Sequence, residues 1–378
     1  MRPEAVAAMA PFLTERFANP SGAHTLAQRS KAALEEARER CAALLGAAAG
    51  ELVFTGGGTE ADNLAVIGAA RAARDAGRGD VVVTTTFEHK AVLAAATALE
   101  QEGFSVRRVA VDRRGIVDLD ALAAALDDRT AVVSVMLVNN EVGTIQPLAE
   151  GATIVRERAP QAVLHTDAVQ AVPWLDVTGA AAPADLVSVS AHKFGGPKGT
   201  GVLVVRDGVA LRPLLVGGGQ ERGLRAGTVD VAGAVAMTAA FQATHESRDA
   251  DGARVRVLRD RLQRDLQESL PEVFVNGDLE RKVAGNCHLR FEGVEAEALL
   301  VALDLAGVCA AAGSSCASGA LEPSHVLLAM GLTREEARAS VRFSLGFASS
   351  DADVDLALEV VPEVVTRLRR APAAALSR

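Results

Sequence analysis

Apolar and polar positions along the chain follow two periods, and the first two thirds of the sequence switch repeatedly between them. Helical spacing of apolar residues predicts helices at 25–45, 59–76, 88–102, 118–126 and 148–159. Short apolar runs predict strands at 51–55, 80–85, 104–111, 130–138, 162–167, 185–190 and 201–206. Strands that alternate with helices indicate an α/β fold with a mostly parallel sheet covered on both faces. In such sheets ligands bind beyond the carboxyl ends of the strands, so we expect the chemistry in those loops.

The pattern changes after about residue 229. A long helical stretch runs to about residue 270, and we expect a break in it near Asp251-Gly252. Fewer strands follow, at 273–275, 286–291 and 341–345, with helices at 295–306 and 352–370. We therefore predict a large domain over 1–240 and a small α/β domain over 241–378, with the N-terminal segment packing on the small domain.

Composition narrows the class of protein. The 378 residues are 49% hydrophobic and 23% charged, as in an ordinary globular enzyme. The net charge of -9 is spread along the chain, so no nucleic-acid surface is expected. No apolar run reaches the roughly 18 residues of a membrane span, and no signal segment opens the chain, which predicts a cytoplasmic protein. The four cysteines are far apart and predict neither a disulfide framework nor a zinc site.

Two loops at predicted strand ends are candidate ligand sites. The segment from Phe54 to Glu60 has three glycines before a helix, where free N–H groups and the helix dipole favour phosphate. The alternative is a glycine-rich turn with Thr59 as the helix N-cap. Asp167 ends an apolar strand, where a carboxylate either lies in solvent or caps a helix, or keeps a bound pyridinium nitrogen protonated.

Lys193 follows another apolar strand in the segment Ser190-Ala191-His192-Lys193. Lysines are rarely buried unless they are paired or functional, and a desolvated lysine becomes a nucleophile towards an aldehyde. The alternative is a solvated lysine in a loop. Arg342 interrupts an alternating strand, and it either faces outward or binds a substrate carboxylate as a bidentate donor.

Cys316 lies in the run Gly313-Ser314-Ser315-Cys316-Ala317-Ser318-Gly319, which has no hydrophobic period. Such a run packs poorly, so we expect an exposed thiol in a flexible loop, which is a candidate nucleophile. For Cys41, Cys287 and Cys309 we instead expect a packing role, because free cysteine usually behaves as a small buried hydrophobe.

Taken in order, these segments resemble the class V aminotransferase family, and within it the cysteine desulfurases. The resemblance covers nearly the whole chain and is carried by short motifs. These are 19–24 (NPSGAH), 54–64 (FTGGGTEADNL), 88–92 (EHKAV), 138–143 (VNNEVG), 167–170 (DAVQ), 190–193 (SAHK), 222–228 (RGLRAGT), the Cys316 run and 342–344 (RFS). The family usually begins with a short strand and an Asp-x-x-Ala-Thr-Thr-Pro segment, and this chain starts at Met1-Arg2-Pro3, inside or just after that segment.

The resemblance implies a fold-type I transferase that uses pyridoxal 5'-phosphate and acts on L-cysteine. It implies that Lys193 binds the cofactor covalently, Asp167 pairs with the pyridinium nitrogen and Cys316 takes the sulfur as a persulfide. The remaining implied roles concern cofactor and substrate contacts. They are ring stacking and proton transfer by His89, contacts near the ring hydroxyl by Asn140 and Gln170, phosphate binding by Gly58, Thr59, Ser190 and His192, contact with the partner subunit's phosphate by Thr228, and binding of the substrate carboxylate by Arg342 with Asn19.

The resemblance further implies a homodimer with shared sites and a sulfur-acceptor or scaffold partner, for iron–sulfur cluster assembly or thiolation. It implies no metal. Selenocysteine cleavage and transamination would use the same lysine, aspartate and arginine, but transamination needs no thiol nucleophile. A non-enzymatic subunit that keeps the fold is a further alternative, which the full set of cofactor residues disfavours.

Overall fold

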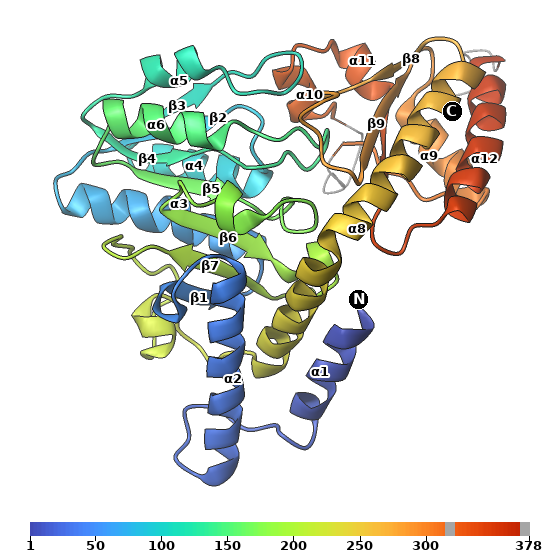
Figure 1. Ribbon diagram of the computed structural model, residues 1–378. Helices are drawn as coiled ribbons and strands as arrows, with labels where there is room; N and C mark the ends of the chain where they lie inside the picture. Colours follow the sequence, from blue (N-terminus) through green and yellow to red (C-terminus); the bar gives the residue numbers. More distant parts are fainter. Residues whose placement is uncertain (314–321, 371–378) are drawn as a thin grey trace. The chain divides into compact units, whose positions relative to one another are not determined.

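The computed structural model describes residues 1–313 and 322–370 (Figure 1). The chain forms two compact units, each of which gathers separate stretches of sequence. The first unit contains Met1–Val109, Val117–Val138 and Gln146–Arg248, and the second contains Ala110–Ile116, Asn139–Ile145 and the chain from Asp249 onward. The domain limits of 1–240 and 241–378 stay a prediction.

A seven-stranded sheet forms the centre of the first unit, in the order β1-β7-β6-β5-β4-β2-β3. Its strands are β1 (Leu52–Thr55), β2 (Val81–Thr85), β3 (Ser105–Val109), β4 (Thr130–Ser134), β5 (Val163–Asp167), β6 (Leu186–Ser190) and β7 (Gly201–Val205). Only β7 runs against its neighbours β6 and β1, and the other paired strands are parallel. The predicted, mostly parallel sheet is therefore confirmed.

Helices and 3-10 turns connect these strands. They are α1 (Pro3–Leu13), α2 (Thr25–Leu44), η1 (Ala49–Glu51), α3 (Gly58–Asp75), α4 (Lys90–Gln101), α5 (Leu119–Ala125), α6 (Leu148–Arg158), α7 (Val177–Ala180), η2 (Ala191–Phe194) and η3 (Gln220–Gly223). Helix α3 packs across the sheet from β4 to β1. Its buried positions are mostly alanine and valine, whose small side chains let the helix approach the strands closely.

The second unit is built on a three-stranded antiparallel sheet in the order β10-β9-β8. The strands are β8 (Val273–Val275), β9 (Asn286–Phe291) and β10 (Ser340–Ser344), and the helices are α9 (Ala296–Leu305), α10 (His325–Ala329), α11 (Arg334–Arg338) and α12 (Asp351–Arg370). In its core, the rings of Phe291 and Phe343 meet edge to face with centroids 6.5 Å apart. The predicted strands of this region are thus confirmed.

Helix α8 (Val231–Ser269) contributes its first half to the first unit and its second half to the second unit. It continues through Asp251-Gly252, so the predicted break is wrong. A glycine inside a helix costs only about 1 kcal/mol relative to alanine. Beyond Gly252 the buried residues continue at helical spacing, at Val255, Leu258, Leu262 and Leu266, and their burial outweighs that cost.

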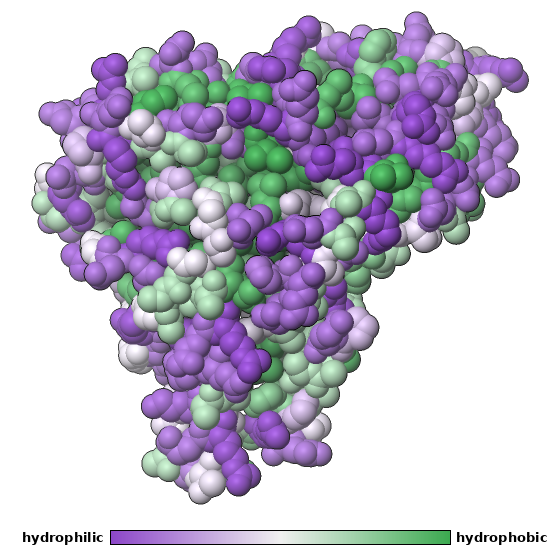
Figure 2. All heavy atoms as spheres, in the orientation of Figure 1, coloured by the Kyte–Doolittle hydropathy of each residue, from purple (hydrophilic) through white to green (hydrophobic). Residues whose placement is uncertain are grey.

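Hydrophilic side chains dominate the face shown in Figure 2, with apolar side chains between them. Within 1–313 and 322–370, no helix combines the length and the apolar character that crossing a lipid bilayer requires.

Candidate active site

The carboxyl ends of two neighbouring parallel strands carry several of the predicted site residues. β5 ends at Asp167 and β6 ends at Ser190, and the register pairs Asp167 with Ser188. The Asp167 side chain is buried, and its Oδ1 accepts a hydrogen bond of 2.9 Å from the backbone N–H of Val169. The turn after β5 therefore holds this carboxyl group at the edge of the sheet where ligands of α/β proteins bind.

Asp167 holds its proton more tightly than an ordinary aspartate. Burial, reinforced by the nearby Asp62 carboxyl group, raises the pKa of Asp167 to about 8. The Val169 amide and the side chains of His165 and Lys193 act in the opposite direction. A ligand that brought a positive charge against this carboxyl group would favour its ionised form.

A buried polar cluster adjoins Asp167, and the sequence did not reveal it. The hydroxyl groups of Ser134 and Ser188 form hydrogen bonds of 2.8 and 2.9 Å with Nδ1 and Nε2 of His165. Oδ1 of Asp62, from α3, lies 3.5 Å from the same Nε2. Burial lowers the pKa of His165 to about 4 and raises the pKa of Asp62 to about 7. The histidine is therefore neutral at neutral pH, and its two ring nitrogens link Ser134 and Ser188 through hydrogen bonds.

Glu88 and His89 lie between β2 and α4. Oε1 of the buried Glu88 accepts hydrogen bonds from the Thr85 hydroxyl and the Met136 backbone N–H, at 2.9 and 2.8 Å. Burial raises the pKa of Glu88 well above its ordinary value, and the Asp167 carboxyl group adds to this. His89 is the N-cap of α4, and its Nδ1 accepts a hydrogen bond of 3.2 Å from Ala91. The cap orients the imidazole and leaves the proton of the neutral ring on Nε2.

Lys193 lies in η2, directly after β6. Its side chain is exposed within this chain, so the expectation of a lysine desolvated by apolar neighbours is wrong. β6 ends at Ser190, and the turn carries the lysine past the buried part of the sheet. The charge of Lys193 acts to lower the pKa of Asp167, against the effect of burial.

The glycine loop after β1 lies against the ends of β5 and β6. A Cβ atom on Gly58 would come within 2.9 Å of Cγ2 of Val169 and 3.3 Å of Cβ of Ser190. Helix α3 begins at Gly58 with Gly57 as its N-cap, and no side chain caps it. Thr59 is exposed within the first turn, so its alternative role as N-cap is wrong. Uncapped amides at the start of this long helix suit an anionic group.

Polar side chains surround this helix start. The Ser190 hydroxyl forms a hydrogen bond of 2.9 Å with Nδ1 of His192. Burial lowers the pKa of His192, and the positive charges of Lys193 and Lys198 add to the shift. Gln170, half-buried, follows Val169 in the turn after β5. The first unit thus offers a carboxyl group, a lysine and several hydrogen-bond donors around one sheet edge. These donors are the amides at the start of α3 and the side chains of Ser190 and His192.

Thr228 is exposed, and the segment that precedes it is hydrogen-bonded to β1. Nη2 and Nη1 of Arg38 bind the two carboxylate oxygens of Glu221 at 2.6 and 2.8 Å, and Glu221 also accepts a 2.8 Å hydrogen bond from the Phe54 N–H. Glu221 and Arg222 have φ angles of 46° and 58°, which are uncommon for residues other than glycine. The buried ion pair holds the chain in this turn before Thr228.

The second unit holds Arg342 and Asn140. Arg342 is half-buried in β10 opposite His288, and its Nη1 donates a 2.7 Å hydrogen bond to the backbone oxygen of Asn140. Burial lowers the pKa of Arg342, and the Glu141 carboxylate opposes the shift. Oδ1 of Asn140 is buried and has no hydrogen-bond partner within 1–313 and 322–370. Asn19, exposed in the first unit, accepts a 2.9 Å hydrogen bond from the Ser21 N–H.

The four cysteines differ in their surroundings. Cys316 lies outside the described residues. Cys41 and Cys287 are buried, as predicted, and burial raises the pKa of their thiols to about 12 and about 11. Cys309 is exposed, so its expected packing role is wrong. It follows Val308 just after α9, beyond the helical apolar period that would bury it.

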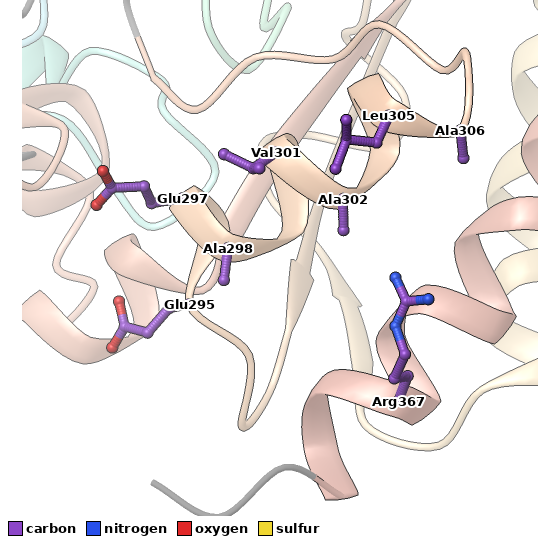
Figure 3. A pocket seen from close by; sticks show the side chains of 8 residues that line it. All are labelled: Glu295, Glu297, Ala298, Val301, Ala302, Leu305, Ala306 and Arg367. Atoms are coloured by element: carbon purple, nitrogen blue, oxygen red, sulfur yellow. The ribbon is translucent and has the colours of Figure 1, made fainter. Parts of the chain in front are cut away.

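A groove of about 770 Å³ follows α9 and contains none of the predicted site residues (Figure 3). Its floor is apolar, with Val301 and Leu305 exposed, and the Arg367 side chain of α12 points towards it. It offers no cluster of titratable groups comparable with the edge of the large sheet.

Comparisons with known proteins agree with this arrangement. The family model described as aminotransferase class V matches residues 1–357. The cysteine desulfurase IscS of Clostridium botulinum (strain Kyoto / Type A2) is 42% identical over 370 residues, which are 97% of this chain and 92% of that protein. The chain belongs to the aminotransferase class V family.

Solved structures match the fold of most of the chain. A NifS-like protein has a TM-score of 0.91 and 33% identity, covering 97% of this chain and 96% of its own. SspA, solved in complex with cysteine, has a TM-score of 0.79 and 31% identity, covering 93% of this chain and 97% of its own. The predicted fold-type I architecture is confirmed.

Proposed function

We propose that the chain is a cysteine desulfurase, which takes sulfur from L-cysteine, releases L-alanine and holds the sulfur as a persulfide on Cys316. The observation that carries the proposal is the buried Asp167 at the end of β5, beside the strand β6 that leads into Lys193, in a chain 42% identical to a named cysteine desulfurase. The matching structure of SspA with cysteine supports L-cysteine as the substrate.

The proposed cofactor is pyridoxal 5'-phosphate, which when bound withdraws electrons from the α-carbon of an attached amino acid. Asp167 fits the ring nitrogen, because a cation beside it would offset the burial that raises its pKa. The uncapped start of α3, with Gly58 and Thr59, fits the phosphate together with Ser190 and His192. Lys193 is the proposed covalent attachment point.

The other proposed contacts come from both units. His89 is assigned to stack on the ring and to transfer protons, with its imidazole oriented by the cap at α4. Gln170 and Asn140 are assigned to the ring hydroxyl, and Asn140 has a buried side-chain oxygen to use. Thr228 is assigned to the phosphate of the partner subunit, which makes the enzyme a homodimer with shared sites.

Arg342 and Asn19 are assigned to the substrate carboxylate. Arg342 retains donors for it, because its hydrogen bond to Asn140 uses only Nη1 among the nitrogen atoms that carry its five N–H groups. Nζ of Lys193 is assigned to remove the α-proton of the bound substrate. The Cys316 thiolate then attacks the substrate sulfur, so that an S–S bond forms and the C–S bond breaks. The electron pair of the broken bond takes a proton, and the α-carbon regains the proton that Lys193 removed, which leaves alanine and an enzyme persulfide.

The remaining assignments concern the cell. We propose a cytoplasmic enzyme that passes its sulfur to an acceptor or scaffold protein, for iron–sulfur cluster assembly or thiolation. The burial of Cys41 and Cys287 supports the choice of Cys316, because their raised pKa values disfavour the thiolate.

Incubation of the purified protein with L-cysteine and pyridoxal phosphate tests the function. We expect alanine and sulfide in equal amounts when a reducing thiol releases the persulfide. 3-Mercaptopyruvate in place of alanine would indicate transamination, and turnover of selenocysteine but not cysteine would indicate a selenocysteine lyase. Either result would overturn the proposal.

A further inference from the structure

Glu141, in the second unit, is the buried residue on which both flanks of the Cys316 run converge. One oxygen of its carboxylate, Oε2, accepts a hydrogen bond from the hydroxyl of Ser324. A Cβ atom on Gly313 would lie 3.5 Å from the same Oε2 and 3.3 Å from Cβ of Ser324. Gly313, the first residue of the run, and Ser324, which follows the run, therefore lie together at one carboxylate.

The backbone around Glu141 is fixed from both sides. Oδ1 of Asn139 accepts hydrogen bonds from the N–H groups of Glu141 and Val142, at 2.9 and 3.0 Å. Nδ2 of Asn286 donates a 2.8 Å hydrogen bond to the backbone oxygen of Glu141. Gly143, with φ of 77°, lets Asn286 come this close, because a Cβ there would lie 2.6 Å from Cβ of Asn286. Glu141 is thus a rigid point of the second unit.

The same stretch of chain also holds Arg342. The residue before Glu141, Asn140, accepts the 2.7 Å hydrogen bond from Nη1 of Arg342. The backbone of Arg342 in turn forms a bridge with Ala311, through hydrogen bonds of 2.7 and 3.0 Å. The chain that leads into the Cys316 run is therefore hydrogen-bonded to the residue assigned to the substrate carboxylate.

This connection matters because the carboxylate and the sulfur of cysteine are separated by a fixed, short chain of bonds. A nucleophile that must meet the sulfur gains from being anchored in the same rigid frame as the group that binds the carboxylate. We propose that Glu141 is a positioning residue, which through Ser324 fixes the flanks of the Cys316 run relative to Arg342. The inference rests on the proposed function, because it assumes that Cys316 is the nucleophile.

Ser324→Ala tests the inference, because it removes the donor to Glu141 and leaves the carboxylate in place. The measurement is the rate at which iodoacetamide alkylates Cys316, followed by peptide mass spectrometry with the exposed Cys309 as an internal reference. We expect the rate ratio of Cys316 to Cys309 to rise at least three-fold, and kcat for cysteine to fall at least ten-fold with a smaller change in KM. Ser324→Thr keeps the hydroxyl and should restore both values.

Thr333→Ala is the matched control. Ser324 caps α10 and Thr333 caps the next helix, α11, each through its side-chain oxygen, but Thr333 is hydrogen-bonded to Glu336 rather than to Glu141. Both changes therefore remove a helix cap, and only one removes the anchor. A ratio in Ser324→Ala that rises less than three-fold, falls, or equals that of Thr333→Ala overturns the inference.

The two proposals fail in different ways. The alkylation assay uses no substrate and needs no turnover. If wild type forms no persulfide on Cys316, the proposed function fails, and the inference fails with it. If wild type forms the persulfide and Ser324→Ala behaves like Thr333→Ala, only the role of Glu141 is wrong.

Discussion

Nε2 of His165 lies 3.5 Å from Oδ1 of Asp62, inside a buried cluster that also interacts with Asp167. The cluster places two carboxyl groups of raised pKa, about 7 and about 8, around a histidine whose pKa is lowered to about 4. A cationic ring nitrogen beside Asp167 would relieve the repulsion between these carboxylates. The cluster is therefore suited to a cationic ligand, and its protonation should be visible in the stability of the cofactor-free protein.

Cofactor-free protein should lose stability as the pH rises from 6.5 to 8. Asp167 keeps its proton in the folded state up to about pH 8, whereas the unfolded aspartate loses it near its ordinary value. Each such proton costs about 1.4 kcal/mol per pH unit within this window, so Asp167 alone should contribute a loss of roughly 2 kcal/mol. Asp62 and Glu88, whose pKa values are also raised by burial, add to the decline. His165 is neutral in both states above pH 6.5 and contributes nothing here.

Thermal unfolding of the cofactor-free protein at both pH values measures this loss. Asp167→Asn should lessen the decline, because the amide has no proton to release. Asp80→Asn is the control, since Asp80 is paired with Arg129 at the surface, and it should leave the decline unchanged. An Asp167→Asn protein that declines as steeply as wild type would contradict the raised pKa.

Lys193→Ala should abolish the visible absorbance of the bound cofactor, because no other group in the turn after β6 offers an amine in its place. Borohydride reduction of the wild-type holoenzyme, followed by peptide mapping, should mark Lys193. Lys198→Ala removes an exposed lysine of the same region and should keep the absorbance. A mark on any other lysine rules out the assignment.

Arg342→Ala should chiefly weaken the binding of cysteine. A charge-assisted hydrogen bond to a carboxylate contributes roughly 1.5–3 kcal/mol, so KM should rise about ten- to a hundred-fold. Arg290→Ala is the matched control, because Arg290 lies in the neighbouring strand β9 and is paired with Glu336. It should lower the melting temperature and leave KM unchanged. Unchanged KM and kcat in Arg342→Ala would exclude the proposed role.

The assignment of Thr228 to the partner subunit predicts complementation between two inactive variants. Thr228→Asp should repel the phosphate, and Lys193→Ala removes the attachment point. In a mixed dimer, the site that has an intact Lys193 receives its Thr228 from the other subunit, so activity should return to at most half of wild type. Light scattering should give a dimer for each variant. No recovery on mixing, or an active monomer, would contradict shared sites.

The architecture of the large sheet could be predicted because its strands are short apolar runs separated by helical periods, and β5 and β6 show this clearly. Four helices were missed for physical reasons. α1 is rich in alanine and contains Pro11, which masks its period, α7 has only four residues, and α10 and α11 have five each. Such short helices are stabilised by caps and tertiary packing, which a periodic pattern does not report.

Residues of the candidate site could be predicted from the sequence only where they lie at the end of a predicted strand. Asp167 and Ser190 were found because they end parallel strands. Asp62 and Glu141 were missed because an isolated acidic residue is usually solvent-exposed, and their burial results from packing against distant segments. The expected burial of Lys193 was wrong for a related reason, because a single turn beyond a strand end changes the surroundings of the side chain.

The central claim, that Cys316 takes the sulfur, is tested most directly by mass spectrometry of the protein after treatment with L-cysteine. The account predicts one added sulfur on the peptide that contains Cys316 in wild type. It predicts none in Cys316→Ser, which should keep its bound cofactor and form little alanine, because a hydroxyl group is a far weaker nucleophile than a thiolate. Changing Cys41, Cys287 or Cys309 to alanine should leave the added sulfur in place. An added sulfur on another cysteine, or normal turnover by Cys316→Ser, would contradict the account.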